Sequence, residues 1–191
     1  MIVSPPYYNE MTSFVFKCKD VDCRQIIICR YLHILLDYYY KDFFLIPSFQ
    51  KKNFDEFIKT ISNDFVELYN QSAKAEEYGC KDIAGAGYRK ALEFIIKDFA
   101  IDCNNNDKEE ITKMSLSTVI EKYIHNSKLK EITKRAVWLG NDETHYERKW
   151  DKNIEDLKKL IDIAVHYITM EKEVASYIAE MFTNTKSETK T

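Results

Sequence analysis

The sequence has few of the residues that form tight turns, with four Gly and three Pro among 191 residues. Sandwiches and barrels need many such turns, so the composition disfavours these all-β architectures. The chain also lacks an apolar run of about 18 residues, the length of a membrane-spanning helix. The most apolar stretch, residues 25–36, is interrupted by Arg30 and His33. We therefore expect no membrane partner.

A strong positive charge is missing as well. The formal net charge is −3, so the protein has no global positive field that would recruit nucleic acid. This net charge does not exclude a local basic patch. The five Cys are an odd number, and residues 1–6 contain no basic region followed by an apolar stretch. These features do not fit a secreted, disulfide-linked protein, and we expect reduced thiols in a cytoplasm.

The chain contains enough apolar residues to form a hydrophobic core. Its hydrophobic content is 45%, and 31% of its residues are charged. A chain of this length fits one domain, or one domain with a small appendage.

The first fifty residues show the period of β-strands. Ser13–Lys19 alternates between two sets of side chains, and Arg24–Leu35 is rich in Ile. Tyr38–Gln50 is predicted as an aromatic-rich connection. We therefore expect residues 1–52 to form a small β-hairpin appendage.

From Asn53 the apolar residues recur with a helical period, and a mainly α bundle of about five helices is predicted over residues 53–182. Asn53 and Glu56 form a candidate capping box for the first helix. The five predicted helices cover about residues 53–78 and 81–101, the stretch from Leu116 to Ile124, the stretch from Ser127 to Leu139, and a long helix that begins at Asp151. The polar tail, residues 183–191, is predicted to be disordered.

Three glycines carry specific expectations. Gly85 and Gly87 lie inside the second predicted helix, where each costs about 1 kcal/mol relative to Ala. Their presence predicts a close approach to a neighbouring helix. Gly140 lies where a glycine would end the fourth helix.

Four segments in this order resemble the domain-of-unknown-function 4145 family, a relative of the HEPN helical domains. The second predicted helix carries Arg89 followed by Ala91, Leu92 and Glu93, as in that family. The segment around Leu116 and Ile120 resembles its short middle helix. "WLGNDETH" resembles its Gly-Asn-x-x-x-His element, and "WDKNIEDLKKLIDIAVHYI" resembles its closing helix. The resemblance covers about residues 45–170.

This resemblance implies a HEPN-like bundle, a homodimer, and a setting in prokaryotic defence or phage counter-defence. Active HEPN ribonucleases carry an Arg, a polar residue directly after it, and a His, with four to six residues between the Arg and the His. Asn141 and His145 match the polar residue and the His, but Gly140 occupies the Arg position. The nearest upstream Arg, Arg135, lies outside that spacing.

Four residues are the candidate ligand-binding site: Arg89, Glu93, Asn141 and His145. Cleavage of RNA without a metal needs a base and a group that stabilises the developing charge. His145, Arg89 and Asn141 are therefore the catalytic candidates. The alternative interpretation is a buried polar cluster, in which Arg89 bridges to the Asn141–His145 segment and His145 bonds to the backbone or to Glu93.

A metal site is a further alternative near the N-terminus. Cys18 and Cys23 have the spacing of a zinc knuckle, and Cys29 and His33 follow them. Relatives of the family often begin with a zinc-ribbon-like segment built from two Cys pairs, whereas this chain has one such pair. We therefore expect a degenerate ribbon without a cofactor, with zinc at these four residues as the alternative.

Three functions remain after these observations. The leading hypothesis is a non-catalytic HEPN-like module that binds a protein, a nucleotide or RNA. The second is a metal-independent endoribonuclease with an altered motif, which would use His145 and Arg89. The third is a nucleic-acid-binding adaptor that depends on the N-terminal hairpin.

Overall fold

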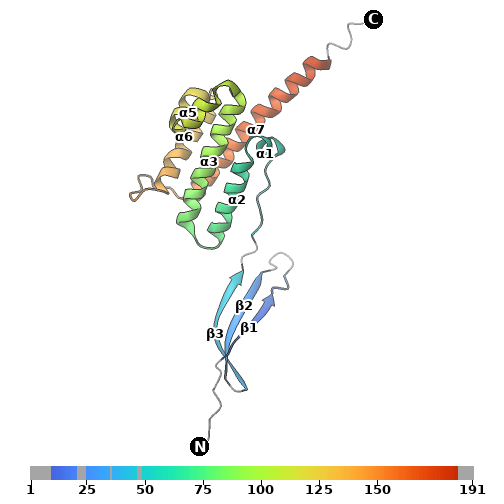
Figure 1. The fold of residues 1–191 in the computed structure, drawn as a ribbon, viewed down its shortest axis with the longest axis vertical. Coiled ribbons are helices and arrows are strands. Elements are labelled where there is room, and N and C mark those ends of the chain that lie inside the picture. Colours follow the sequence, from blue (N-terminus) through green and yellow to red (C-terminus); the bar gives the residue numbers. More distant parts are fainter. Residues whose placement is uncertain (1–9, 21–24, 35, 47–48, 185–191) are drawn as a thin grey trace, which may run out of the picture. The chain divides into compact units, whose positions relative to one another are not determined.

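The protein is mainly helical and has a small N-terminal sheet (Figure 1). The computed structural model describes residues 10–20, 25–34, 36–46 and 49–184. The chain divides into two compact units, residues 1–50 and residues 51–191. Most of the predicted disordered tail, residues 185–191, lies outside the described residues.

The first unit is a three-stranded antiparallel sheet in the order β1-β2-β3. Its strands are β1 (Glu10–Lys17), β2 (Ile26–Ile34) and β3 (Asp37–Ile46). β1 and β2 agree with the predicted hairpin. β3 corrects the prediction of a connection, because the aromatic run from Tyr38 through Leu45 pairs with β2 on both sides of a bulge at Lys41. Aromatic residues suit a pleated surface, but a strand that is apolar on both faces shows no alternation in its sequence.

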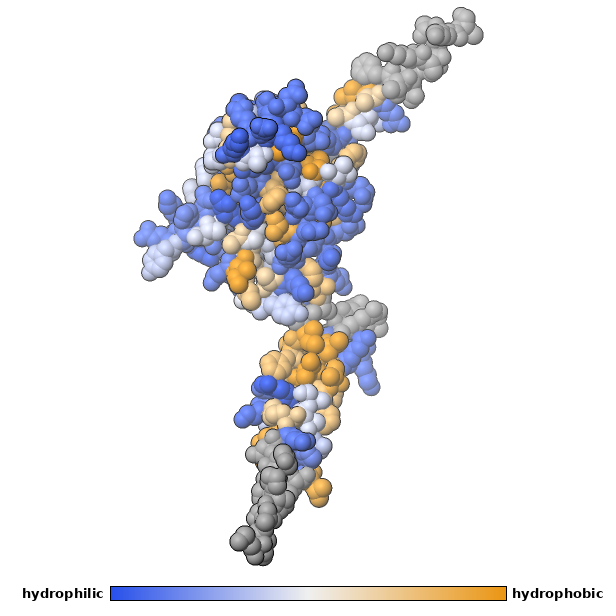
Figure 2. Space-filling view, in the orientation of Figure 1, coloured by the Kyte–Doolittle hydropathy of each residue, from blue (hydrophilic) through white to orange (hydrophobic). Residues whose placement is uncertain are grey.

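Apolar side chains gather at the end of the sheet where residues 14–16, 26–29 and 43–46 pair (Figure 2), and they alternate between its two faces. On one face, Phe14 meets Tyr31 edge to face, with ring centroids 5.4 Å apart. On the other face, Arg30 pairs with Asp42 and covers the ring of Phe44. Phe14 and Phe44 are nevertheless 41% and 48% exposed. Monomeric proteins rarely expose contiguous apolar patches, so this exposed apolar surface is an unusual feature.

The second unit is a helical bundle. Its α-helices are α1 (Glu56–Ile61), α2 (Asn63–Glu77), α3 (Lys81–Cys103), α4 (Lys108–Lys113), α5 (Leu116–Tyr123), α6 (Ser127–Asp142) and α7 (Ile154–Asn184), with one 3-10 turn, η1 (Asn105–Asp107).

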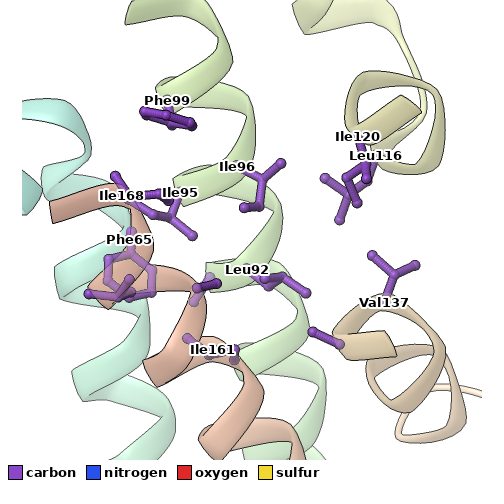
Figure 3. Packing of buried hydrophobic residues seen from close by; sticks show 14 of the residues in the cluster. Phe65, Leu92, Ile95, Ile96, Phe99, Leu116, Ile120, Val137, Ile161 and Ile168 are labelled. Carbon is purple, nitrogen blue, oxygen red and sulfur yellow. The ribbon is translucent and has the colours of Figure 1, made fainter. Parts of the chain in front are cut away.

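The central helix is α3, because its buried residues contact both sides of the bundle (Figure 3). Leu92, Ile95 and Ile96 have no exposed surface. Phe65 of α2 and Ile161 of α7 approach α3 from one side. Leu116, Ile120 and Val137, from α5 and α6, lie on the other side. One continuous core therefore holds the helices that carry the predicted site.

The helix boundaries differ from the predictions at three places. The first predicted helix is two helices, α1 and α2, separated at Ser62, and α1 is capped by Asp55 rather than Asn53. α4 forms where the sequence predicted no separate helix. The Asn153 side chain, rather than Asp151, accepts hydrogen bonds from the first backbone amides of α7. Each difference comes from a side-chain hydrogen bond at a helix end or from a helix of only a few residues. The spacing of apolar residues in the sequence predicts neither of these.

Gly85 and Gly87 both lie at close contacts, as predicted. A Cβ atom on Gly87 would lie 3.1 Å from the Cβ atom of Ser72 in α2. A Cβ atom on Gly85 would lie 2.6 Å from Oε2 of Glu143, beyond the end of α6. The missing side chains let α3 approach both neighbours.

Candidate functional site

Gly140 lies inside α6 and does not end it. It is buried, and a Cβ atom there would lie 2.9 Å from Cγ and 3.1 Å from Cβ of Arg89. The predicted C-cap role is wrong, because α6 continues to Asp142. The residue is needed as glycine because the aliphatic stem of Arg89 crosses α6 at this point.

The predicted bridge from Arg89 to the Gly140–His145 segment is present. Nε of Arg89 donates a hydrogen bond to Oδ1 of Asn141 over 3.0 Å. The guanidinium also pairs with Glu93, with 3.5 Å between Nη1 and Oε2. Burial opposes the charge of Glu93, but a hydrogen bond from Lys97 and the nearby cations hold the pKa of this carboxyl below its usual value. Arg89 therefore has two partners inside the protein.

The buried Asp142 organises the chain that follows α6. Its Oδ2 atom accepts hydrogen bonds from the backbone amides of Lys149, over 2.9 Å, and Trp150, over 2.8 Å. These bonds close residues 143–150 into a loop. Asp142 was missed by the sequence interpretation. The available signal was its position, since an acidic residue in the last turn opposes the helix dipole and needs a specific partner.

Glu143 contacts both α3 and the loop of residues 143–150. Its side chain is only 5% exposed and packs on Gly85 of α3. Its carboxylate pairs with Arg148, with 3.2 Å between Oε2 and Nη2. Residues 140–143 are thus the junction between α3, α6 and the loop.

The loop places one tryptophan on another. The Trp138 and Trp150 rings stack with centroids 5.3 Å apart and an interplanar angle of 6°. They are 42% and 46% exposed. These are the only two Trp residues of the chain. We call this pair the tryptophan shelf.

Two grooves adjoin the tryptophan shelf. The first has a volume of about 590 Å³, and both tryptophans line it together with Asn141, His145 and Lys149. The second has a volume of about 440 Å³. It is lined by both tryptophans, by the apolar residues Leu139, Leu160 and Ile163, and by Arg135, Lys152, Lys159 and Asp156. Because Arg135 is paired with Glu131, Lys152 and Lys159 supply the local positive charge of this second groove.

His145 lies at the first groove rather than in a buried cluster. The residue is exposed, and it is bound through its backbone, whose amide donates to the carbonyl of Asn141 over 3.0 Å. No hydrogen bond to the described residues orients its ring. Arg89 and Glu93 do not line this groove. The interpretation of His145 as a buried polar group bonded to the backbone or Glu93 is therefore wrong, because its ring faces solvent.

The candidate zinc ligands lie in the sheet unit. Cys29 is in the middle of β2, between Phe14 and Phe43, and His33 stacks on Tyr38 with centroids 4.4 Å apart. Four residues of extended strand separate Cys29 from His33 by about 13 Å, which is too far for one zinc ion. Cys18 follows β1, and Cys23 lies outside the described residues. Among the residues that the structure does describe, no group of three or more His, Cys, Asp or Glu could hold a metal ion.

Comparison of the chain with protein-family models, with curated proteins and with solved structures finds no match. Within the described ranges, no helix has the length and apolar character needed to cross a membrane.

Proposed function

We propose that the protein is a non-catalytic binding module with a HEPN-like bundle, and that it binds nucleotide bases, as in single-stranded RNA, on the tryptophan shelf. The observation that carries this proposal is the pair of stacked, half-exposed tryptophans between two grooves. A setting in prokaryotic defence or phage counter-defence follows from the sequence resemblance alone.

The chemistry of the tryptophan shelf suits a base and its phosphate. Every base has a π face, and stacking on an aromatic side chain contributes about 1–3 kcal/mol per base. Lys152 and Lys159 line the second groove, where they can pair with phosphate oxygens, whereas Arg135 beside them is paired with Glu131. A local cationic groove of this kind is compatible with a net charge of −3 for the whole chain.

The geometry does not favour cleavage. A metal-independent ribonuclease needs a base and a cation at the same phosphate. His145 lines the first groove, whereas Arg89 is held by Asn141 and Glu93 and does not line it. No described residue orients the imidazole, and the pair of His145 with Arg89 that the ribonuclease hypothesis uses is not assembled, since the cation that lines the first groove with His145 is Lys149.

The sheet unit gives less support to the adaptor hypothesis. Its exposed surface is mostly apolar, and Arg30 is paired with Asp42 (Figure 2). Nucleic-acid binding by a sheet normally combines aromatic residues with free cations. The cations that line a groove instead lie in the helical unit.

Binding can be measured by titrating the full chain with a short single-stranded RNA and recording tryptophan fluorescence. Stacking of bases on the tryptophan shelf should quench the emission. Trp150→Ala should weaken the affinity by about 5- to 150-fold, which corresponds to about 1–3 kcal/mol for one lost stack. Tyr39→Ala removes an equally exposed aromatic from the sheet and should leave the affinity unchanged. Loss of binding in Tyr39→Ala alone would favour the adaptor hypothesis instead.

Catalysis is tested separately with the same RNA. Incubation with the purified protein in chelator should leave the RNA intact. If the wild-type protein cleaves the RNA and His145→Ala abolishes cleavage, the non-catalytic part of the proposal is wrong.

A further inference from the structure

Helix α7 has two parts with different surroundings. The first part, through Ile168, belongs to the bundle and buries Leu157, Ile161, Ala164, Val165 and Ile168 in the core. The second part continues beyond the other helices of the unit (Figure 1). A long helix that leaves its bundle needs a reason to remain helical, because isolated helices are marginally stable in water.

A second apolar stripe runs along the outer side of α7. We define the outer stripe as Ile163, Tyr167, Met170, Val174 and Tyr177. Tyr167 is partly buried against the core, and the other four are 42%, 47%, 53% and 65% exposed in chain order. Each outer-stripe residue lies on another side of the helix from the core-facing residues, since two positions along a helix correspond to a rotation of about 200°.

The spacing of the outer stripe is that of a coiled coil. Successive members are separated by four, three, four and three residues. Such a heptad pattern places Tyr167 and Val174 at a positions, and Ile163, Met170 and Tyr177 at d positions. The partner that fits this spacing is another helix with the same repeat, because a and d side chains insert between those of a facing helix. Binding to a flat apolar surface would not require apolar residues that are spaced alternately by three and four positions.

We propose that the outer stripe pairs in parallel with the outer stripe of a second copy of this chain. The charges beside the stripe favour this partner and this direction. In a parallel pair, g residues face e residues five positions later in the other chain. His166 then faces Glu171, and Glu173 faces Ile178, so no two carboxylates oppose each other. In an antiparallel pair, g faces g and e faces e. In the register that sets Val174 against Met170, this brings Glu173 against Glu173 and Glu171 against Glu171 of the other copy.

One residue type at the stripe agrees with two strands. Val174 is β-branched and lies at an a position, where such residues favour parallel dimers. A parallel pair of identical helices also closes by a two-fold axis, so each copy contributes the same surface and no open filament forms. The outer stripe does not include Trp138 or Trp150, but its first residue, Ile163, also lines the second groove beside them.

The association is tested by light scattering and sedimentation of the full chain over a range of concentrations. The wild-type protein should approach twice the chain mass of 22.7 kDa. Val174→Glu places a charge inside the pair and should shift the protein to the monomer. Ser176→Glu adds the same charge on an exposed position outside the stripe and should remain a dimer. Circular dichroism of both variants shows whether the bundle is intact, which is expected because both side chains are exposed.

The direction of the helices is tested by cross-linking. Val174→Cys should form an intermolecular disulfide under mild oxidation, because equivalent a residues face each other only in a parallel pair. Ser176→Cys and the wild-type chain report cross-links from other thiols. A monomer at the highest soluble concentration, or a dimer that Val174→Glu leaves intact, would overturn the proposal. A dimer that Val174→Glu disrupts but Val174→Cys does not cross-link would overturn the parallel arrangement.

Discussion

At Gly140, a missing side chain allows two helices to cross. The aliphatic stem of Arg89 occupies the space that a Cβ atom would need, and this position carries Nε of Arg89 to the amide oxygen of Asn141. The contact joins α3 to the end of α6, where the loop with Trp150 begins. A change of one carbon atom at this residue is therefore expected to disturb the site.

Gly140→Ala should destabilise the protein by about 1–3 kcal/mol, the usual cost of overpacking a well-packed contact. This direction is opposite to the usual effect inside a helix, where Ala is about 1 kcal/mol better than Gly. The free energy of unfolding is measured by urea denaturation. In an Arg89→Ala background the contact with Cγ is gone and the contact with Cβ remains, so the same substitution should cost less. Equal destabilisation in both backgrounds would show that the Arg89 side chain beyond Cβ is not the cause.

The residues of the site were predictable where chemistry and spacing agreed. Arg89 and Asn141 were expected to bridge, and they do. Asp142 was not identified, because its partners are backbone amides of residues 149 and 150, which no side-chain pattern marks. His145 was expected in a cluster but is exposed, because α6 ends before it and the loop directs it to solvent.

At the scale of elements, the separation of α1 from α2 depends on one serine. The Ser62 hydroxyl accepts a hydrogen bond from the backbone amide of Phe65 over 3.3 Å, which caps α2. It also donates to Asp98 of α3. Burial raises the pKa of Asp98, although the bond from Ser62 opposes that shift. Ser62 thus begins one helix and satisfies a half-buried carboxylate on another.

Ser62→Ala should reduce the free energy of unfolding by about 1–3 kcal/mol, since it removes a cap and a partner of a charged group. Ser115 is the matched control, because its hydroxyl caps α5 by accepting from Thr118 and is exposed. Ser115→Ala should cost only the cap, about 1 kcal/mol. Thermal and urea denaturation of both variants give the comparison. A loss no larger in Ser62→Ala than in Ser115→Ala would exclude a contribution from the Asp98 contact.

The elements that the sequence predicted well are those with one clear apolar face. α3, α5 and α6 were predicted close to their observed starts, because their buried residues recur with the helical period. The break at Ser62 was hidden because Ile58, Phe65 and Tyr69 continue one buried stripe across it. β3 was missed for the opposite reason, since side chains on both of its faces are apolar.

At the scale of the helical unit, one charged network joins three helices. Glu76 of α2 accepts a hydrogen bond from the Tyr88 hydroxyl of α3 over 2.9 Å and one from Nζ of Lys158 of α7 over 3.1 Å. Lys158 also pairs with Glu155 over 3.1 Å. Burial works against the charge of Glu76, but the hydrogen bonds from Tyr88 and Lys158 outweigh it and hold the pKa of this carboxyl below its ordinary value of 4.5.

This network predicts a loss of stability in acid. Because the folded pKa of Glu76 is lower than the unfolded one, its contribution is complete above about pH 4.5 and is lost as the pH falls through the folded pKa. Glu76→Gln should lower the free energy of unfolding at pH 7 and make its decline in acid less steep. The exposed pair of Glu131 with Arg135 is the control, and Glu131→Gln should leave the decline unchanged. Urea denaturation at several pH values measures both, and an unchanged slope in Glu76→Gln would contradict the assignment.

The direction of α7 also has a consequence for binding strength. In a parallel pair, both tryptophan shelves belong to one particle and lie near the same end of the paired helices, because each shelf adjoins the start of α7. An RNA long enough to reach both would bind the second shelf as an intramolecular event, at an effective concentration set by its length. Its avidity could then exceed that of a single shelf by about 10²-fold or more, whereas an RNA too short to reach both would gain nothing. The dependence of affinity on RNA length would thus measure the distance between the two shelves.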